Sequence, residues 1–176
     1  MSFEEKHPVV IFADDQPEWH RSIHEVKEEE LAALTNHLKD CEIVSVYDRD
    51  NLFEEIDEQL GRTDVSHIIV FLDLNFKSVD DGLLALNQLT RNKDSRIRQI
   101  PVFVYSISHA PGDVAAVYAR NGAGFYHKLD HPDAFWSALQ AIDRSNKDAF
   151  ILPQPVAYPG DSPTVTTDLE DDQLLP

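Results

Sequence analysis

Cysteine, basic residues and long apolar runs are all scarce in this sequence. One cysteine, Cys41, occurs in 176 residues, which excludes an internal disulfide. It directly precedes an apolar run, so we expect a small buried side chain. No stretch approaches the ~20 consecutive apolar residues of a membrane-spanning helix, and the amino-terminal Met-Ser-Phe-Glu-Glu-Lys has no apolar targeting core. These absences predict a soluble, cytoplasmic protein.

The shortage of basic residues also limits the partners. Lysine and arginine number 15 against 32 acidic residues, which gives a formal net charge of −17. Nucleic-acid binding depends largely on Lys and Arg contacts to phosphates, so we expect no nucleic-acid partner and no attachment to anionic membranes. Most of the acidic side chains are interpreted as a solvated surface that keeps the protein in solution.

The chain length allows one domain with a substantial core, which we place at residues 1–150. Residues 153–176 hold five of the ten prolines, five acidic residues and no basic residue. Such a composition buries too little apolar surface to offset chain entropy. We therefore predict that residues 151–176 form an acidic, flexible tail, and that truncation after Leu152 leaves thermal unfolding nearly unchanged.

Apolar runs alternate with helical patterns along the first 150 residues. The runs predict strands over residues 8–13, 42–47, 67–72, 102–105 and 125–127. Apolar stripes predict helices from near Pro17 to Leu38, from a cap at Asp50 or Asn51 to Gly61, over 82–91, over 114–120 and from 132 onward. Residues 92–98 are predicted to be a polar loop. Alternation of this kind indicates an α/β fold with a parallel sheet covered by helices on both faces.

Polar residues stand where four of these strands end. Asp14 and Asp15 follow the first strand and Asp73 follows the third, while Ser106 and Lys128 end the last two. Open α/β sheets bind ligands at the carboxyl ends of their strands. Three carboxylates there repel, at about 4 kcal/mol per pair for a separation of about 4 Å and an effective dielectric of about 20. Lys128 and a hard divalent cation, Mg²⁺ above all, would offset that repulsion.

The ordered set Asp-Asp, Asp, Ser, Lys at strand ends resembles the receiver domain of two-component response regulators, the CheY-like family. The resemblance covers roughly residues 7–147. It implies the flavodoxin-like (βα)5 fold, a doubly wound parallel sheet with strand order 2-1-3-4-5. It also implies a stand-alone signalling domain, not an enzyme acting on external substrates. Its partners would be a histidine kinase or histidine phosphotransfer protein and an unidentified downstream protein.

The resemblance further implies a role for each site residue. Asp73 would be the phosphoacceptor, with Lys128 pairing first with it and then with a phosphoryl oxygen, and Ser106 would hydrogen-bond another such oxygen. Mg²⁺ would be held by Asp15 directly, by Asp14 mainly through water, by Asp73, and by the backbone carbonyl of Asn75. Phe125, three residues before Lys128, falls at the aromatic switch position.

The sequence departs from the family pattern at several points. Leu129 stands where a proline usually follows the lysine, the loop 75–82 lacks its usual proline and is longer, and the first helical segment is also longer. Ile107 replaces the small residue that normally follows the switch hydroxyl. We predict that this stiff side chain narrows the opening above Asp73 and slows both phosphorylation and dephosphorylation. Alternatively, Ile107 packs under the following loop.

Three other interpretations compete with phosphorylation signalling. A degenerate receiver would use the same fold as a protein-binding module without phosphorylation. A haloacid-dehalogenase-like phosphatase is disfavoured because that class has a second acid two residues after the nucleophile, where Asp73 is followed by Asn75 and Asp15 by Pro17. A zinc site at His20, His24 and His37 is also disfavoured, because no cysteine joins them and a polar helix face explains them more simply.

Overall fold

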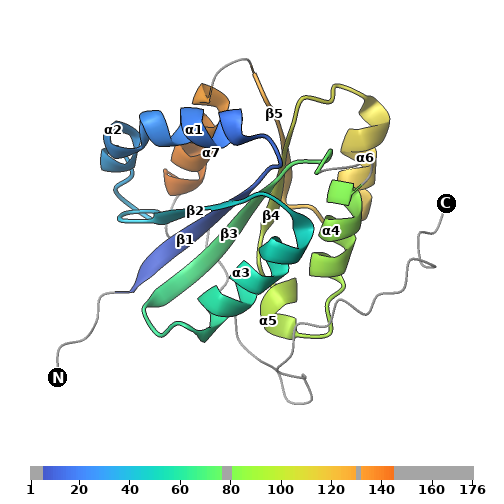
Figure 1. The fold of residues 1–176 in the computed structure, drawn as a ribbon, viewed down its shortest axis with the longest axis horizontal. Helices are drawn as coiled ribbons and strands as arrows, with labels where there is room; N and C mark the ends of the chain where they lie inside the picture. Colours follow the sequence, from blue (N-terminus) through green and yellow to red (C-terminus); the bar gives the residue numbers. More distant parts are fainter. Residues whose placement is uncertain (1–5, 77–80, 130–131, 145–176) are drawn as a thin grey trace.

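The computed structural model describes residues 6–76, 81–129 and 132–144. Five parallel strands form one sheet in the order β2-β1-β3-β4-β5, as Figure 1 shows. Their bounds are His7–Ala13 for β1, Glu42–Val46 for β2, Val65–Leu72 for β3, Val102–Ser106 for β4 and Gly124–His127 for β5. This is the doubly wound order 2-1-3-4-5 that the resemblance implied, and the prediction is confirmed.

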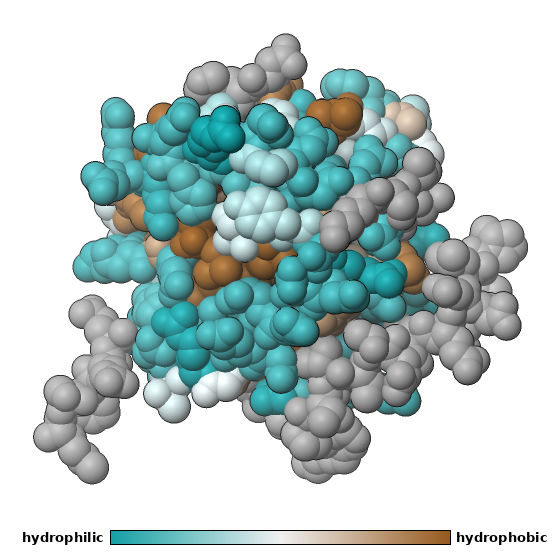
Figure 2. Space-filling model, in the orientation of Figure 1, coloured by the Kyte–Doolittle hydropathy of each residue, from teal (hydrophilic) through white to brown (hydrophobic). Residues whose placement is uncertain are grey.

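The helices cover both faces of the sheet (Figure 1). They are α1 (Pro17–Glu25), α2 (Lys27–Ala32), α3 (Arg49–Gly61), α4 (Asp81–Thr90), α5 (Ser95–Arg98), α6 (Pro111–Ala119) and α7 (Asp133–Asp143). Within the described ranges, none of them has the length and apolar character required to traverse a bilayer. Most of the face seen in Figure 2 is hydrophilic, and apolar side chains appear as a band across its middle.

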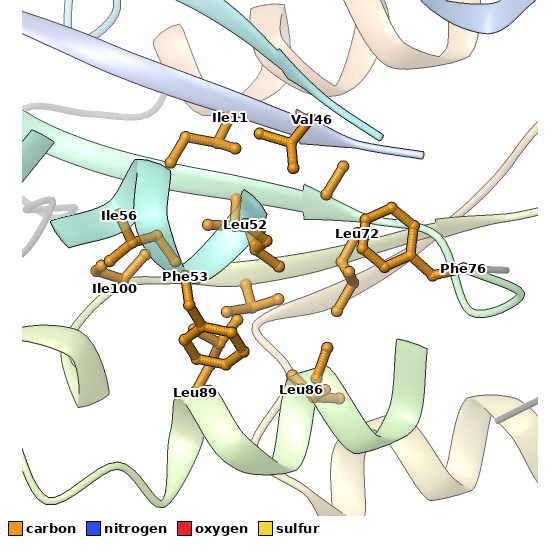
Figure 3. Close-up of a cluster of buried hydrophobic side chains, with 14 of the residues drawn as sticks. Ile11, Val46, Leu52, Phe53, Ile56, Leu72, Phe76, Leu86, Leu89 and Ile100 are labelled. Carbon is orange, nitrogen blue, oxygen red and sulfur yellow. The ribbon is translucent and has the colours of Figure 1, made fainter. Parts of the chain in front are cut away.

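Two apolar cores lie on opposite faces of the sheet, because alternate strand residues point to opposite sides. Along β1, Val9 and Ile11 belong to one core, and Val10 and Phe12 belong to the other. The first core packs against α3, α4, α5 and α6, and Figure 3 shows part of it. The second packs against α1 and α7. Cys41 lies in this second core, as predicted for a small buried side chain.

Three local predictions are corrected by the structure. The first helical segment is interrupted at Val26, whose backbone (φ −106°, ψ 5°) separates α1 from α2. Helix α3 is capped by Asp48, not by Asp50 or Asn51, since the Asp48 side chain accepts from the Asn51 N–H at 2.9 Å. The segment 92–98 contains α5, a single helical turn, in place of the predicted loop.

A carboxylate fastens the end of α7 to the chain after α2. Asp143 is 1 % exposed, and its Oδ1 accepts hydrogen bonds from the backbone N–H groups of Asn36 and Leu38, its Oδ2 from that of Thr35, each at 2.9 Å. Burial alone would raise the pKa of Asp143, but the three backbone donors prevail and lower it below its ordinary value of 3.8. The ionised carboxylate therefore stabilises the folded chain.

We expect Asp143→Asn to destabilise the domain by about 3 kcal/mol, because a carboxamide turns N–H groups toward backbone donors and loses charge-assisted hydrogen bonds. Because the pKa of Asp143 is lower in the folded chain than in the unfolded chain, its ionised carboxylate stabilises the fold completely above pH ~4. This stabilisation is lost as the pH falls through the pKa of Asp143 in the folded chain. The stability difference between wild type and variant should therefore shrink in acid. Urea unfolding at neutral pH and below pH 4 tests this. Asp57→Asn, on the exposed face of α3, is the control, and a difference independent of pH would contradict the account.

Candidate functional site

Backbone hydrogen bonds align the chain just beyond the carboxyl ends of the strands. The Asp14 N–H donates to the Val46 carbonyl at 3.0 Å, and the Asp73 N–H donates to the Ala13 carbonyl at 2.9 Å. At the same edge, between the ends of β4 and β5, the Lys128 N–H donates to the Ser106 carbonyl at 2.8 Å. These bonds extend the ladder beyond the last strand residues, so the polar residues that follow are held by the sheet itself.

The three predicted carboxylates come together at this edge. Each of Asp14, Asp15 and Asp73 offers an oxygen, and these oxygens lie within 4.8 Å of one another. Asp14 and Asp73 are buried, at 0 % and 3 % exposed, whereas Asp15 is half-buried. Such proximity is unfavourable without positive charge, as the sequence analysis anticipated.

Lys128 supplies positive charge inside the site and is itself buried. Its Nζ contacts Asp14 Oδ2 and lies 3.2 Å from Asp73 Oδ2. The ammonium also lies 5.4 Å from the centre of the Trp19 ring and 5.9 Å from that of Tyr105. Cation–π attraction at these distances adds to the ion pairs and holds the ammonium between the carboxylates and the aromatic faces.

One cation does not neutralise three carboxylates. Burial raises the pKa of Asp73, Lys128 opposes the rise, and the charge of Asp14 adds to it. Asp73 Oδ1 is buried and accepts no hydrogen bond among the described residues. Clustered carboxylate oxygens, one of them unpaired, are ligands that a hard divalent cation prefers. The residues present therefore fit a divalent metal ion held by Asp14, Asp15 and Asp73.

The remaining predicted residues surround this cluster. Ser106 is fully buried at the end of β4, and its Oγ accepts from the Ser108 N–H at 3.3 Å. Asn75 lies two residues beyond Asp73 with an exposed side chain, and the role of its carbonyl as a ligand stays a prediction. Phe125 is half-buried against the first core, with its ring 5.4 Å from that of His127. Its switching also stays a prediction.

Ile107 is 55 % exposed, so it does not pack under the loop that follows it. That alternative is wrong. The proposed gating of the site by Ile107 stays a prediction.

The role of His20 was not predicted from the sequence. The prediction of a polar helix face is wrong for this residue, which is 2 % exposed and lies 2.7 Å from the Asp14 carbonyl oxygen. Its spacing of three from Ile23, the other buried residue of α1, was the available signal. Among the described residues, the three aspartates form the one group of three or more candidate metal ligands, so a zinc cluster of His20, His24 and His37 is not found.

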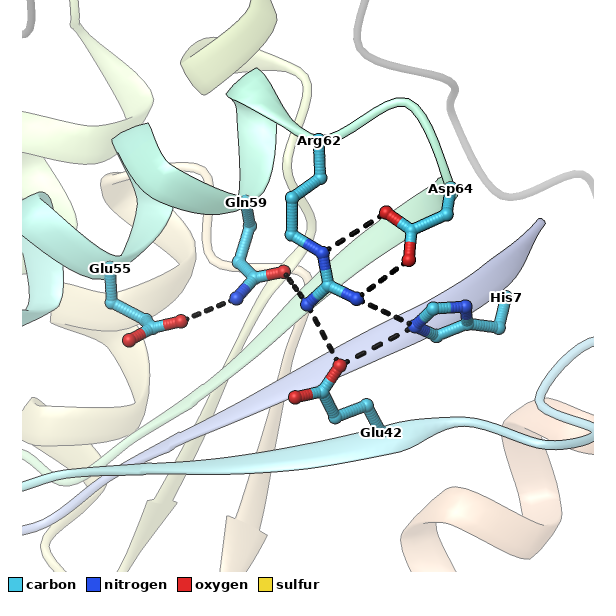
Figure 4. A network of polar contacts seen from close by, with 6 residues as sticks. All are labelled: His7, Glu42, Glu55, Gln59, Arg62 and Asp64. Atoms are coloured by element: carbon cyan, nitrogen blue, oxygen red, sulfur yellow. Dashed lines mark hydrogen bonds and ion pairs between the residues drawn. The ribbon is translucent and has the colours of Figure 1, made fainter. Parts of the chain in front are cut away.

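A second polar network lies at the opposite edge of the sheet, where the strands begin (Figure 4). Arg62 bridges Asp64 and Glu42 at 2.9 and 2.8 Å, and its Nη2 lies 3.2 Å from His7 Nε2. A pocket of about 780 Å³ opens beside it, lined by residues that include His7 and Glu42. Arg62 and its partners join the starts of β1, β2 and β3, so we interpret the network as structural.

Comparisons with known proteins support the fold of this chain. No family model matches the chain, and no curated protein matches it. Solved structures do match, among them the Mn²⁺-bound form of the response regulator Rcp1, with a TM-score of 0.60, 22 % identity, and coverage of 83 % of this chain and 99 % of that one. The phosphorylated cyanobacterial phytochrome response regulator RcpA matches with a TM-score of 0.61 and 22 % identity, over 84 % of this chain and 99 % of that one. A response regulator receiver domain from Rhodospirillum rubrum matches with a TM-score of 0.59 and 18 % identity, over 84 % of this chain and 98 % of that one.

Proposed function

We propose that this chain, which has the fold of response regulator receiver domains, is a cytoplasmic receiver that accepts a phosphoryl group on Asp73. A histidine kinase or histidine phosphotransfer protein would donate the group, and contact with a downstream protein would transmit the signal. The observation that carries the proposal is the position of Asp73 beside Asp14, Asp15 and Lys128 at the carboxyl edge of the sheet. The phosphorylated state of RcpA and the bound metal of Rcp1 support it by analogy.

The chemistry asked of Asp73 is a displacement at phosphorus. A carboxylate oxygen of Asp73 attacks the phosphorus of a phosphohistidine, the P–N bond breaks, and the donor imidazole leaves with its electron pair. Lys128 lies 3.2 Å from Asp73 Oδ2, close enough to move to a phosphoryl oxygen as the new P–O bond forms. The Ser106 hydroxyl, at the end of the neighbouring strand, would donate to another oxygen. A bound Mg²⁺ would neutralise charge on these phosphoryl oxygens.

The raised pKa of Asp73 matters for this reaction, since only the ionised carboxylate attacks. Burial, the main cause of the rise, also removes water that would compete with the donor. Lys128 opposes the rise, and cation binding would oppose it further. The site thus couples acceptance of the phosphoryl group to the presence of positive charge beside Asp73.

Intact-mass measurement after treatment with a small acyl phosphate and Mg²⁺ tests the proposal. We expect one phosphoryl increment, and we expect no increment when the metal is chelated. A protein that binds Mg²⁺ but never gains the increment would be a degenerate receiver that acts by binding alone. Multiple turnovers of simple phosphate esters would show an enzyme instead, and the proposal predicts none.

Magnesium affinity should depend more on Asp15 than on Asp14. The Asp14 carboxylate is fully buried and contacts Lys128. The Asp15 carboxylate is half-buried and so stays open to an arriving cation, which makes it the better candidate for a direct ligand. We expect Asp15→Asn to weaken binding about a hundredfold and Asp14→Asn about tenfold. Fluorescence of Trp19, which packs against Lys128, can follow the titration. Wild-type affinity in Asp15→Asn would refute this order.

A further inference from the structure

We propose that His20 is a positioning residue for the acidic pair, holding the peptide between Asp14 and Asp15 by a hydrogen bond to the Asp14 carbonyl oxygen. The proposal rests on the proposed function, because it concerns how the pair is presented to a cation. Its starting observation is independent of that function. His20 Nε2 lies 2.7 Å from the Asp14 carbonyl oxygen, and the histidine side chain is buried.

The hydrogen bond fixes the tautomer of His20. A carbonyl oxygen can only accept, so Nε2 must carry the hydrogen and donate it. Nδ1 is buried and has no hydrogen-bond partner among the described residues, and a proton there would leave an unpaired N–H away from water. The ring is therefore neutral, with its hydrogen on Nε2.

Aromatic side chains from β1 and from the residue after β2 hold the imidazole in place. The ring centre of Phe12, in β1, lies 4.9 Å from that of His20 with the rings nearly perpendicular, and the centre of Tyr47, which follows β2, lies 4.1 Å away. Helix α1 turns back over the end of β1, which brings His20 to the carbonyl of a residue six positions earlier. The donor is thus positioned by packing before any ligand binds.

The other polar groups of Asp14 have separate partners, which leaves its carbonyl to His20. The Asp14 N–H donates to the Val46 carbonyl, Oδ1 accepts from the Gln16 N–H, and Oδ2 contacts Lys128. Because a peptide unit is planar, the direction of the Asp14 carbonyl also sets the plane of the Asp15 N–H and the course of the chain into Asp15. His20 therefore orients the Asp15 carboxylate through the peptide unit that joins Asp14 to Asp15.

Two substitutions separate the hydrogen bond from the packing. His20→Phe keeps a flat ring between Phe12 and Tyr47 but removes the donor, whereas the amide of His20→Gln can place an N–H near the Nε2 position. We expect Mg²⁺ affinity, measured by NMR titration, to fall about tenfold in the phenylalanine variant and to recover in the glutamine variant. His24→Phe is the matched control, because His24 is exposed one turn later on α1 and is bonded to Ser45.

Metal-free NMR spectra test the proposal even if the proposed function fails. In the wild type, long-range imidazole ¹H–¹⁵N couplings should show His20 as the Nε2–H tautomer at neutral pH. The Asp15 amide signal should shift in His20→Phe and return toward its wild-type position in His20→Gln. An Nδ1–H tautomer, an unshifted Asp15 amide in His20→Phe, or wild-type Mg²⁺ affinity in that variant would overturn the proposal. A wild type that binds no Mg²⁺ but passes the metal-free tests would refute the proposed function alone.

Discussion

Asp73→Asn is expected to abolish the phosphoryl increment completely. The carboxamide is nearly isosteric with the carboxylate but is not a nucleophile at neutral pH, so no P–O bond can form. Asp14 and Asp15 should not substitute for it, because Asp14 is already bound to Gln16 and Lys128, and we assign Asp15 to the metal. Intact mass after treatment with an acyl phosphate and Mg²⁺ measures the outcome. An increment that persists in the variant would place the acceptor elsewhere.

The same substitution should leave the fold intact, which separates lost chemistry from lost structure. The folded pKa of Asp73 is raised, chiefly by burial, so the ionised carboxylate destabilises the folded chain at neutral pH. Removing its charge also leaves Lys128 paired with Asp14. We therefore expect the melting temperature of Asp73→Asn to equal or slightly exceed that of the wild type. Asp57→Asn, exposed on α3, should keep both the increment and the wild-type melting temperature.

The fold, and the polar residues that meet at one edge of the sheet, were predictable from the sequence because both depend on where apolar runs end. A strand buried on both faces leaves a clear signal, and the residue after it must lie at the sheet edge. Asp14, Asp73 and Lys128 were placed correctly on that basis alone. Strand order came from the family resemblance, since periodicity does not specify which strands are neighbours.

Other features were missed or misread in the sequence. Asp143 binds backbone groups more than 100 positions away, and nothing in its neighbourhood distinguishes it from a solvated acid. His20 was misread because a histidine near charged residues looks like part of a polar face. The tail prediction for residues 151–176, including its dispensability for folding, lies outside the described residues and stays a prediction.

Gly82 is another position whose importance only the structure reveals. It is the second residue of α4, is buried, and donates its N–H to the Leu74 carbonyl at 2.9 Å. A Cβ built on it would lie 2.6 Å from the Leu74 carbonyl oxygen and closer still to that of Asp73. Both neighbours are backbone atoms, which cannot turn aside as a flexible side chain would. The start of α4 therefore packs directly on the chain at Asp73 and Leu74.

We expect Gly82→Ala to destabilise the domain by about 3 kcal/mol, as overpacking does where the obstructing atoms are backbone. For a domain of this size that lowers the melting temperature by about 10 °C. The methyl group must push α4 away or displace the Asp73 carbonyl, so phosphoryl uptake by the folded variant should fall as well. Gly112, the second residue of α6, is the matched control, because a Cβ there meets nothing within 4 Å. Gly112→Ala should stabilise by up to about 1 kcal/mol through helix propensity, and equal melting temperatures for the two variants would disprove the close contact at Gly82.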